Sequence, residues 1–327
     1  MPEEVRELSR KQLSLSDPGA TIISMRAARE RIRLVEGHSF RVLRWTRSLR
    51  EVECLVSPGA FLPIQSEGTH WHYHPEMELT LFTSGEGTRF VGDNIESFRS
   101  GDLVLLGEKL PHYWHTQGAS SGLSVQWHFP ESHPFWAFPE NAPLAALFKK
   151  AGRGLQLEAR VAREVSGLMV ALSSCTGTQQ LGGLLNLLGR ISQMTEAQAR
   201  FLSVRSFALS PESQHQQAIA SAVRYLVANY REEVRLESVL QLTGMSKPTF
   251  ARQFKQHSGR TFSEFINGLR LQAACLDLAQ STRSILDISL ACGFSQISFF
   301  NRLFRRSMQC SPSEYRARAH PPASREG

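Results

Sequence analysis

The sequence predicts an α+β fold for its 327 residues: a β-barrel or sandwich, then a helical segment, then an all-helical C-terminal domain. Short alternating or apolar runs separated by turn residues dominate residues 39–129, as expected for strands. From Pro143 onward, apolar residues recur at helical spacing. A repeat near the C-terminus predicts that one helical unit occurs twice.

The predicted strand-rich domain occupies residues 21–130 and follows a loose, polar N-terminus, residues 1–20. Its clearest strand candidates are separated by Gly, Pro, Asp and Asn residues. They are residues 40–43, 78–82, 102–106 and 123–127. Closely spaced short strands of this kind are typical of a sandwich or barrel.

Residues 131–205 are predicted to be helical. Leu144, Leu147 and Phe148 show the i, i+3, i+4 spacing of one helical face, and similar apolar stripes follow. These helices can dock on the strand-rich domain or pair two subunits. The next residues, 206–217, are polar and are predicted to be a linker.

The repeat lies within a predicted domain of residues 218–318, with its copies at about 236–257 and 284–307. Each copy has a glycine suited to ending a helix and a serine suited to starting the next. Two phenylalanines spaced four residues apart then share one helical face. The matched positions are Gly244, Ser246, Phe250 and Phe254 in the first copy and Gly293, Ser295, Phe300 and Phe304 in the second. Helix, tight turn and helix predict two helix-turn-helix motifs.

A long helix is predicted between the two motifs. Thr261 and Glu264 form a capping box at its start, and it continues to about Gln280, a length of roughly 28–30 Å. Helices that read successive major grooves lie about 34–36 Å apart, so this helix has a suitable length for a spacer. A second capping box at residues 311–314 starts the last helix, and residues 319–327 are predicted to be a tail.

The positive charge is confined to the C-terminal part of the chain. Residues 219–327 carry 15 Lys and Arg against 8 Asp and Glu, a net charge of +7, whereas residues 1–218 carry 22 of each kind. A basic helical domain with paired helix-turn-helix motifs predicts double-stranded DNA as its partner.

The composition also bears on location. The five cysteines are scattered and never spaced C-x-x-C, which argues for reduced thiols and against a disulfide framework or a zinc ribbon. No apolar run approaches the roughly 20 residues of a membrane span, and the N-terminus lacks the apolar core of a signal peptide. A cytoplasmic protein without membrane contact is therefore expected.

Residues 219–318 resemble the DNA-binding domain of AraC/XylS-type transcription regulators. The resemblance is carried by both motifs and the long helix between them: Gly244, Met245, Ser246, Arg252, Phe254, Lys255, Gly259, Arg270, Ala291, Cys292, Gly293, Phe294, Phe300, Asn301, Arg302, Phe304, Arg305, Arg306 and residues 311–315. It implies that the second helix of each motif enters a major groove. It also implies a homodimer, and contact with RNA polymerase where the regulator is an activator.

The candidate DNA-binding residues lie on these two reading helices. They are Lys247, Pro248, Thr249, Ala251, Arg252 and Lys255 in the first, and Gln296, Ile297, Ser298, Asn301, Arg302 and Arg305 in the second. Pro248 and Ala251 offer no hydrogen bonds to base edges, so the first helix is expected to act mainly through phosphates. The second helix has the richer base-reading chemistry. For Arg252 and Arg302 the alternative role is a structural ion pair.

Histidines cluster in the strand-rich part. His72, His74 and Glu78 have the same parity and can share one face of an extended chain. With His112 from a later strand, they can form a three-histidine, one-carboxylate site suited to a divalent transition metal.

The pattern HxHxxxExxxxxxG, from His72 to Gly85, resembles the first motif of the cupin barrel, and residues 101–112 fit the second motif loosely. Barrels joined to such a DNA-binding domain usually sense a small molecule, so the resemblance implies an effector pocket. The candidate pocket residues are Trp71, His72, His74, Glu78, His112 and Trp114. The tryptophan rings can stack on a sugar or an aromatic effector, and the alternative is that they belong to the barrel core. We expect the histidines to line this pocket or to make structural hydrogen bonds rather than to hold a metal, so no cofactor is predicted.

The sequence therefore predicts a sequence-specific DNA-binding transcription regulator that responds to an effector and is not an enzyme. The alternative is a cupin-type metalloenzyme carrying a DNA-binding appendage. A third reading makes the barrel a dimerisation module without a ligand. Metal analysis separates the first two, and a thermal-shift screen with metabolites separates the first from the third.

Overall fold

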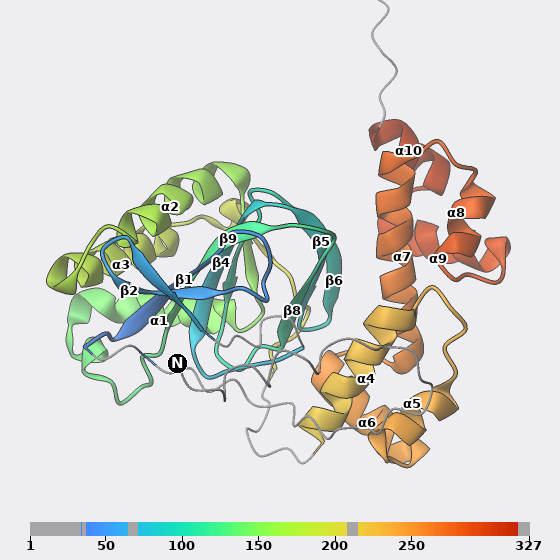
Figure 1. The fold of residues 1–327 in the computed structure, drawn as a ribbon, viewed down its shortest axis with the longest axis horizontal. Helices are drawn as coiled ribbons and strands as arrows, with labels where there is room; N and C mark the ends of the chain where they lie inside the picture. Colours follow the sequence, from blue (N-terminus) through green and yellow to red (C-terminus); the bar gives the residue numbers. More distant parts are fainter. Residues whose placement is uncertain (1–33, 35–36, 65–70, 208–214, 320–327) are drawn as a thin grey trace, which may run out of the picture.

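The computed structural model describes residues 34, 37–64, 71–207 and 215–319. Its two parts are a strand-rich domain up to residue 207 and a helical domain from residue 215. Figure 1 shows the two domains side by side, with the longest helix standing upright in the helical domain. The predicted loose N-terminus, residues 1–20, lies outside the described residues. So does the greater part of the predicted linker, residues 208–214.

Two antiparallel sheets form the strand-rich domain, one with strand order β11-β10-β7-β4-β9-β1-β2-β3 and the other with order β6-β5-β8. The large sheet contains β1 (Phe40–Trp45), β2 (Glu53–Ser57), β3 (Ala60–Pro63), β4 (Met77–Ser84), β7 (Leu103–Leu106), β9 (Ser121–Trp127), β10 (Leu155–Leu157) and β11 (Ala199–Phe201). The small sheet contains β5 (Glu86–Val91), β6 (Asn94–Arg99) and β8 (His112–Thr116). The four strand candidates from the sequence correspond to β1, β4, β7 and β9.

Strand β4 alternates apolar and polar residues from Met77 to Leu81, yet both of its faces are buried. Leu79 and Leu81 pack into the core beneath the helices, whereas Glu78, Thr80 and Phe82 face the space between the two sheets. The buried polar side chains of Glu78 and Thr80 bond each other and the side chains of Gln126 and Ser124 on β9.

Helices cover the face of the large sheet that lies away from the helical domain (Figure 1). They are α1 (Ala142–Ala151), α2 (Ala159–Leu172) and α3 (Gly177–Ser192), with the short 3-10 helices η2 (Pro134–Ala137), η3 (Pro139–Asn141) and η4 (Glu196–Gln198) between elements. The segment 131–205 is not helical throughout, because β10 and β11 interrupt it and extend the large sheet through β7. Each of these strands has three residues, which is too short to show a period in the sequence.

The helical domain contains α4 (Gln216–Asn229), α5 (Leu236–Thr243), α6 (Lys247–Ser258), α7 (Phe262–Gln280), α8 (Ile285–Ala291), α9 (Ile297–Met308) and α10 (Pro312–Ala319). Helix α4 begins slightly before the predicted domain start at residue 218, and α10 includes residue 319, where the tail was predicted to begin. Residues 320–327 lie outside the described residues.

Helix α7 has the predicted start and length. Its 19 residues span about 28 Å, and Thr261 and Glu264 form the reciprocal capping box. One apolar core surrounds Phe254 beside the first half of α7, and a second surrounds Phe304 beside its other half. No helix in the described part of the chain combines the length and apolar character needed to span a bilayer.

The two domains pack against each other along the small sheet. The Phe265 ring of α7 lies 6.4 Å from that of Trp71 and 6.0 Å from that of Phe90, measured between ring centroids. At the edge of this apolar contact, the Tyr73 hydroxyl donates a 2.8 Å hydrogen bond to the Gln216 side chain in α4. The contact joins residues that are far apart in the sequence and gives the domains one defined arrangement.

Candidate DNA interface and interior site

The outer face of α6 is determined by the two phenylalanines on its inner face. Phe250 and Phe254 are buried with ring centroids 5.1 Å apart, and Gly244 ends α5 in the left-handed conformation at φ 64°. Lys247, Pro248, Ala251, Arg252 and Lys255 are consequently exposed. Of the predicted contact residues in this helix, Thr249 alone is half-buried, and its hydroxyl accepts a 2.9 Å hydrogen bond from Ser246 Oγ.

Helix α9 repeats this arrangement on the other side of α7. Phe300 and Phe304 face the core, while Gln296, Ser298, Arg302 and Arg305 are exposed and Ile297 and Asn301 are half-buried. The preceding turn is tighter than that at Gly244. A Cβ atom added to Gly293 would lie 2.7 Å from the Tyr230 carbonyl oxygen and 2.8 Å from the Arg231 carbonyl oxygen.

The basic side chains on these two faces are available for an external partner. Within the described residues, Lys247, Arg252, Lys255, Arg302 and Arg305 form no ion pair within 4.0 Å. The Arg302 guanidinium lies 5.6 Å from the Phe299 ring centroid. The structural ion pair considered for Arg252 and Arg302 is therefore absent from the described part, and both cations can meet phosphates or base edges.

Arg270, in the middle of α7, has a different role. Its Nε donates to the Tyr230 carbonyl at 2.7 Å and its Nη2 donates to the Glu232 carbonyl at 2.9 Å. These bonds hold the end of α4 against α7. Arg270 is thus a structural arginine, and sequence spacing alone does not distinguish it from the arginines on the reading helices.

The candidate histidines of the strand-rich domain do come together. His72 and His112 pair through their backbones, and the ligand nitrogens of His72, His74 and His112 all lie within 4.8 Å of one another in a buried cluster. Glu78 completes the group: its Oε2 lies 3.0 Å from His74 Nε2 and 3.6 Å from His112 Nε2. The structure therefore brings the four predicted residues together in one buried cluster.

The protonation of this cluster follows from its hydrogen bonds. Nδ1 of His74 contacts the Glu76 carbonyl at 3.0 Å, and Nδ1 of His112 contacts the Leu110 carbonyl at 2.8 Å. Because a carbonyl oxygen only accepts, each Nδ1 donates and each Nε2 of a neutral ring presents a lone pair to Glu78. The 3.0 Å His74–Glu78 contact therefore needs a proton on one of the two groups or a metal ion between them.

The Glu78 carboxylate is already well satisfied by the protein. Thr80 Oγ1 donates to Oε1, and Gln126 Nε2 donates to Oε2 at 2.6 Å. Burial alone would raise the pKa of Glu78, but the hydrogen bonds and charges of His112 and His74 outweigh burial and hold that pKa well below its ordinary value. The three histidine nitrogens fit a divalent transition metal, and each oxygen of Glu78 keeps a lone pair with which it could join them.

The cavity beside this cluster is small. It has a volume of about 40 Å³ and is lined by His72, Glu78 and Trp114 together with apolar and polar side chains from β1, β4 and β9. That volume is close to the roughly 30 Å³ occupied by one water molecule. Of the residues predicted for this pocket, Trp71, His74 and His112 are not among those that line the cavity. The side chain of Trp71 points the other way and packs against Phe90 and Phe265.

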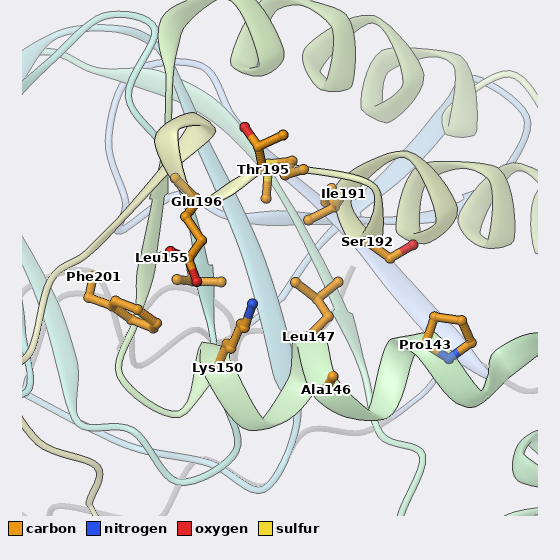
Figure 2. Close-up of a pocket in the computed structure, with 12 residues that line it drawn as sticks. Pro143, Ala146, Leu147, Lys150, Leu155, Ile191, Ser192, Thr195, Glu196 and Phe201 are labelled. Carbon is orange, nitrogen blue, oxygen red and sulfur yellow. The ribbon is translucent and has the colours of Figure 1, made fainter.

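A further pocket lies between α1, the end of α3 and strands β10 and β11, well away from the histidines. Figure 2 shows the side chains of Lys150 and Glu196 pointing toward each other, with the apolar side chains of Leu147, Leu155 and Ile191 around them. Its volume is about 360 Å³, and Leu147, Leu155 and Ile191 form the buried part of the wall. Sequence patterns did not indicate this pocket, because its walls come from segments about fifty residues apart.

Comparison with known proteins gives consistent results. Residues 239–318 match a family model described as a helix-turn-helix domain. The HTH-type transcriptional activator RhaS of Pectobacterium carotovorum is 26% identical over 260 residues, which cover 76% of this chain and 88% of RhaS. The regulatory protein PocR of Salmonella typhimurium is 34% identical over 113 residues, or 33% of this chain and 37% of PocR.

A crystal structure of a transcriptional regulator with an AraC-type DNA-binding domain from Chromobacterium violaceum is also similar. It is 34% identical, covers 33% of this chain and 96% of that structure, and has a TM-score of 0.31. The matched proteins are regulators, so the metalloenzyme alternative is not favoured. The chain is a DNA-binding transcription regulator and carries an AraC-type helix-turn-helix domain at its C-terminal end.

Proposed function

We propose that α6 and α9 enter two successive major grooves on one face of the same duplex, so that both helix pairs act as reading units. The observation that carries this proposal is the set of exposed cations on both helices, beside opposite ends of α7, which have no ion-pair partner among the described residues. Helix α9 supplies Gln296, Ser298, Asn301 and Arg302, whose side chains can bond base edges. Helix α6 supplies mainly charge, so operator specificity is expected to depend more on α9.

Replacement of Arg252 by alanine is expected to weaken binding to operator DNA by about 1–3 kcal/mol. The guanidinium is exposed and has no acidic partner in the described residues, so its loss affects DNA more than folding. If Arg252 contacts a phosphate, the slope of log affinity against log salt also decreases by about 1. Gel shifts over a range of salt concentrations measure both effects.

Arg47 provides a matched control for that experiment, since it is also exposed but lies in the turn between β1 and β2 of the strand-rich domain. Arg47→Ala is expected to leave DNA affinity unchanged. Equal affinities for Arg252→Ala and the parent protein would remove Arg252 from the interface.

We also propose that the strand-rich domain is a cupin-like sensor and that the protein is an effector-responsive activator. The buried polar cluster around Glu78 supports an interior binding function. At about 40 Å³, however, the interior does not admit a sugar in the arrangement described, so a sugar-sized effector would bind an opened form. Such a ligand changes DNA binding only if its affinity differs between the two forms.

Two protein partners are proposed for this regulator: a second copy of the chain and RNA polymerase. Val170, Leu181 and Leu185 are exposed apolar residues on α2 and α3, and they support pairing of two copies through these helices. As an activator, the protein would contact RNA polymerase. A cytoplasmic location is proposed because the regulators that this chain resembles are bacterial, and bacterial DNA lies in the cytoplasm.

The purified protein is expected to contain far less than one transition-metal ion per chain. Glu78 already accepts hydrogen bonds from Thr80 and Gln126, and a proton on His74 Nε2 accounts for the remaining short contact. Elemental analysis after purification without chelators tests this. One ion per chain that is lost in His72→Ala but kept in His128→Ala, a half-exposed histidine outside the cluster, would establish a metal site instead.

A further inference from the structure

The pocket between α1, the end of α3 and strands β10 and β11 has no role in the functions proposed above. Its volume of about 360 Å³, compared with about 40 Å³ for the interior cavity, falls within the roughly 300–1,000 Å³ typical of small-molecule sites. It lies with the helices on the face of the large sheet that is turned away from the helical domain (Figure 1). A ligand in this pocket would therefore be remote from both reading helices.

Phe201 is the largest apolar side chain that lines the pocket. It is 41% exposed at the end of the edge strand β11, and the Arg153 guanidinium lies 4.2 Å from its ring centroid. Arg153 is itself fixed, because its Nε donates a 2.9 Å hydrogen bond to the Ser203 carbonyl. The Phe201 ring is thus held at the pocket wall, where it offers aromatic surface to a ligand.

Small side chains on α1 leave the pocket open. Pro143 and Ala146 line it and are exposed, and Met194 is half-buried. Because Leu147 and Ile191 are buried behind them, the surface that a ligand meets is made of these smaller groups and the Phe201 ring. Such a wall suits an apolar body of moderate size.

Lys150 and Glu196 are the one cation and the one carboxylate among the residues that line the pocket. Lys150 comes from the last turn of α1 and Glu196 from η4, and their side chains point toward each other (Figure 2). Both are exposed, and within the described part of the chain neither forms an ion pair within 4.0 Å. Two opposite charges therefore face a common space beside the apolar wall.

This arrangement defines a class of ligand. A carboxylate binds a lysine ammonium group, and an ammonium group binds a glutamate carboxylate, through charge-assisted hydrogen bonds. In an α-amino acid both charged groups and the side chain are attached to one carbon atom. We propose that this pocket binds a free apolar α-amino acid, with its carboxylate at Lys150, its ammonium group at Glu196 and its side chain against Phe201.

The two charges favour a free amino acid over the end of a peptide. An N-terminal residue lacks the carboxylate that Lys150 would bind, and a C-terminal residue lacks the ammonium group that Glu196 would bind. The site is separate from the interior cavity and from α6 and α9, so the proposal does not depend on the DNA-reading function.

Calorimetric titration of the full-length protein with L-phenylalanine tests the proposal, and saturable binding at one site per chain is expected. L-Phenylalaninamide lacks the carboxylate and N-acetyl-L-phenylalanine lacks the ammonium group, so each should bind about fivefold more weakly or worse. Absence of saturable binding of L-phenylalanine, or equally strong binding of either analogue, would overturn the proposal.

Charge-removing variants assign the two ends of the ligand. Lys150→Gln should weaken L-phenylalanine binding by about fivefold but leave the weaker binding of the amide unchanged, because the amide has no carboxylate to lose. Glu196→Gln should act in the same way on L-phenylalanine and spare N-acetyl-L-phenylalanine. A merely misfolded variant would lose all three compounds. Lys149→Gln, which changes the exposed neighbour on α1 that lines a different pocket, should bind L-phenylalanine like the parent protein.

A variant that fills the pocket gives an independent test. Ala146→Trp places a large side chain in the pocket from an exposed position on α1 and should abolish L-phenylalanine binding. Ala145→Trp is the matched control, because Ala145 is also exposed on α1 but lines the other pocket. Parent-like binding by Ala146→Trp, or equal loss in both tryptophan variants, would place the ligand elsewhere and overturn the proposal.

Discussion

Replacement of Gly293 by alanine is expected to lower the free energy of unfolding of the helical domain by about 3 kcal/mol or more. The residue has φ 89°, a region that costs an L-residue about 1–2 kcal/mol. Its new Cβ would also lie 2.7 Å from the Tyr230 carbonyl oxygen and 2.8 Å from Arg270 Nε. Separating these atoms disturbs the hydrogen bond that joins α4 to α7, and overpacking of this kind typically costs about 1–3 kcal/mol.

Gly244→Ala is the matched control, because Gly244 occupies the same place in the first repeat. It also has positive φ, at 64°, but no atom lies within 4 Å of its added Cβ. Only the backbone conformation is then affected, with an expected loss of about 1 kcal/mol. Urea denaturation followed by circular dichroism compares the two variants. If both variants lost the same free energy of unfolding, the atoms packed around Gly293 would not be what restricts this position to glycine.

Replacement of Arg89 by methionine is expected to destabilise the strand-rich domain by about 3–5 kcal/mol. Arg89 is 0% exposed, and its guanidinium donates to Asp102 at 2.5 Å and to Glu96 at 3.3 Å. Removing it leaves the buried Asp102 carboxylate with Gln156 as its remaining side-chain donor in the described residues. The cost is that of an uncompensated charge inside the protein, and thermal or urea unfolding measures it.

Arg200→Met serves as the comparison, because Arg200 pairs with the same Glu96 but its side chain is 54% exposed. A surface pair of this kind contributes about 1 kcal/mol or less. If Arg200→Met lowered the free energy of unfolding as much as Arg89→Met, burial of the arginine would not explain the loss of stability.

The contribution of the Arg200–Glu96 pair also depends on pH. Burial raises the pKa of Glu96, but its bonds and charges with Arg200 and Arg89 outweigh burial and lower that pKa in the folded protein. A lowered carboxyl pKa stabilises the fold above the ordinary value, here 4.5, and this stabilisation is lost as pH falls through the folded value. The stability difference between Arg200→Met and the parent should therefore disappear in acid.

The helical domain could be predicted in detail because its signals are local. The capping box at Thr261, the glycine at position 244 and the paired phenylalanines each act within one or two helical turns. They defined α7 and the exposed faces of α6 and α9. Charge counting then indicated an acidic partner, since the excess of Lys and Arg lies in this domain alone.

The strand-rich domain could be predicted only in outline. Four of its strands carry enough apolar residues to be recognised, whereas β10 and β11 consist of three residues each and depend on the sheet they extend. The histidine cluster was predictable because the chain places His72 and His74 close to Glu78, and strand parity directs their side chains together. The size of the cavity beside the cluster could not be predicted, because its walls come from four strands.

What the sequence by itself determined is the architecture: a strand-rich part joined to a helical part in which the long helix α7 lies between two shorter sets of helices. Tertiary structure decided which side chains meet across the chain. Trp71 and His72 are adjacent in sequence, yet Trp71 faces the helical domain and His72 the interior. Lys150 and Glu196 likewise share a pocket only because α1 packs beside the end of α3. Periodicity reports the face of each residue, whereas the partner opposite that face depends on packing between distant segments.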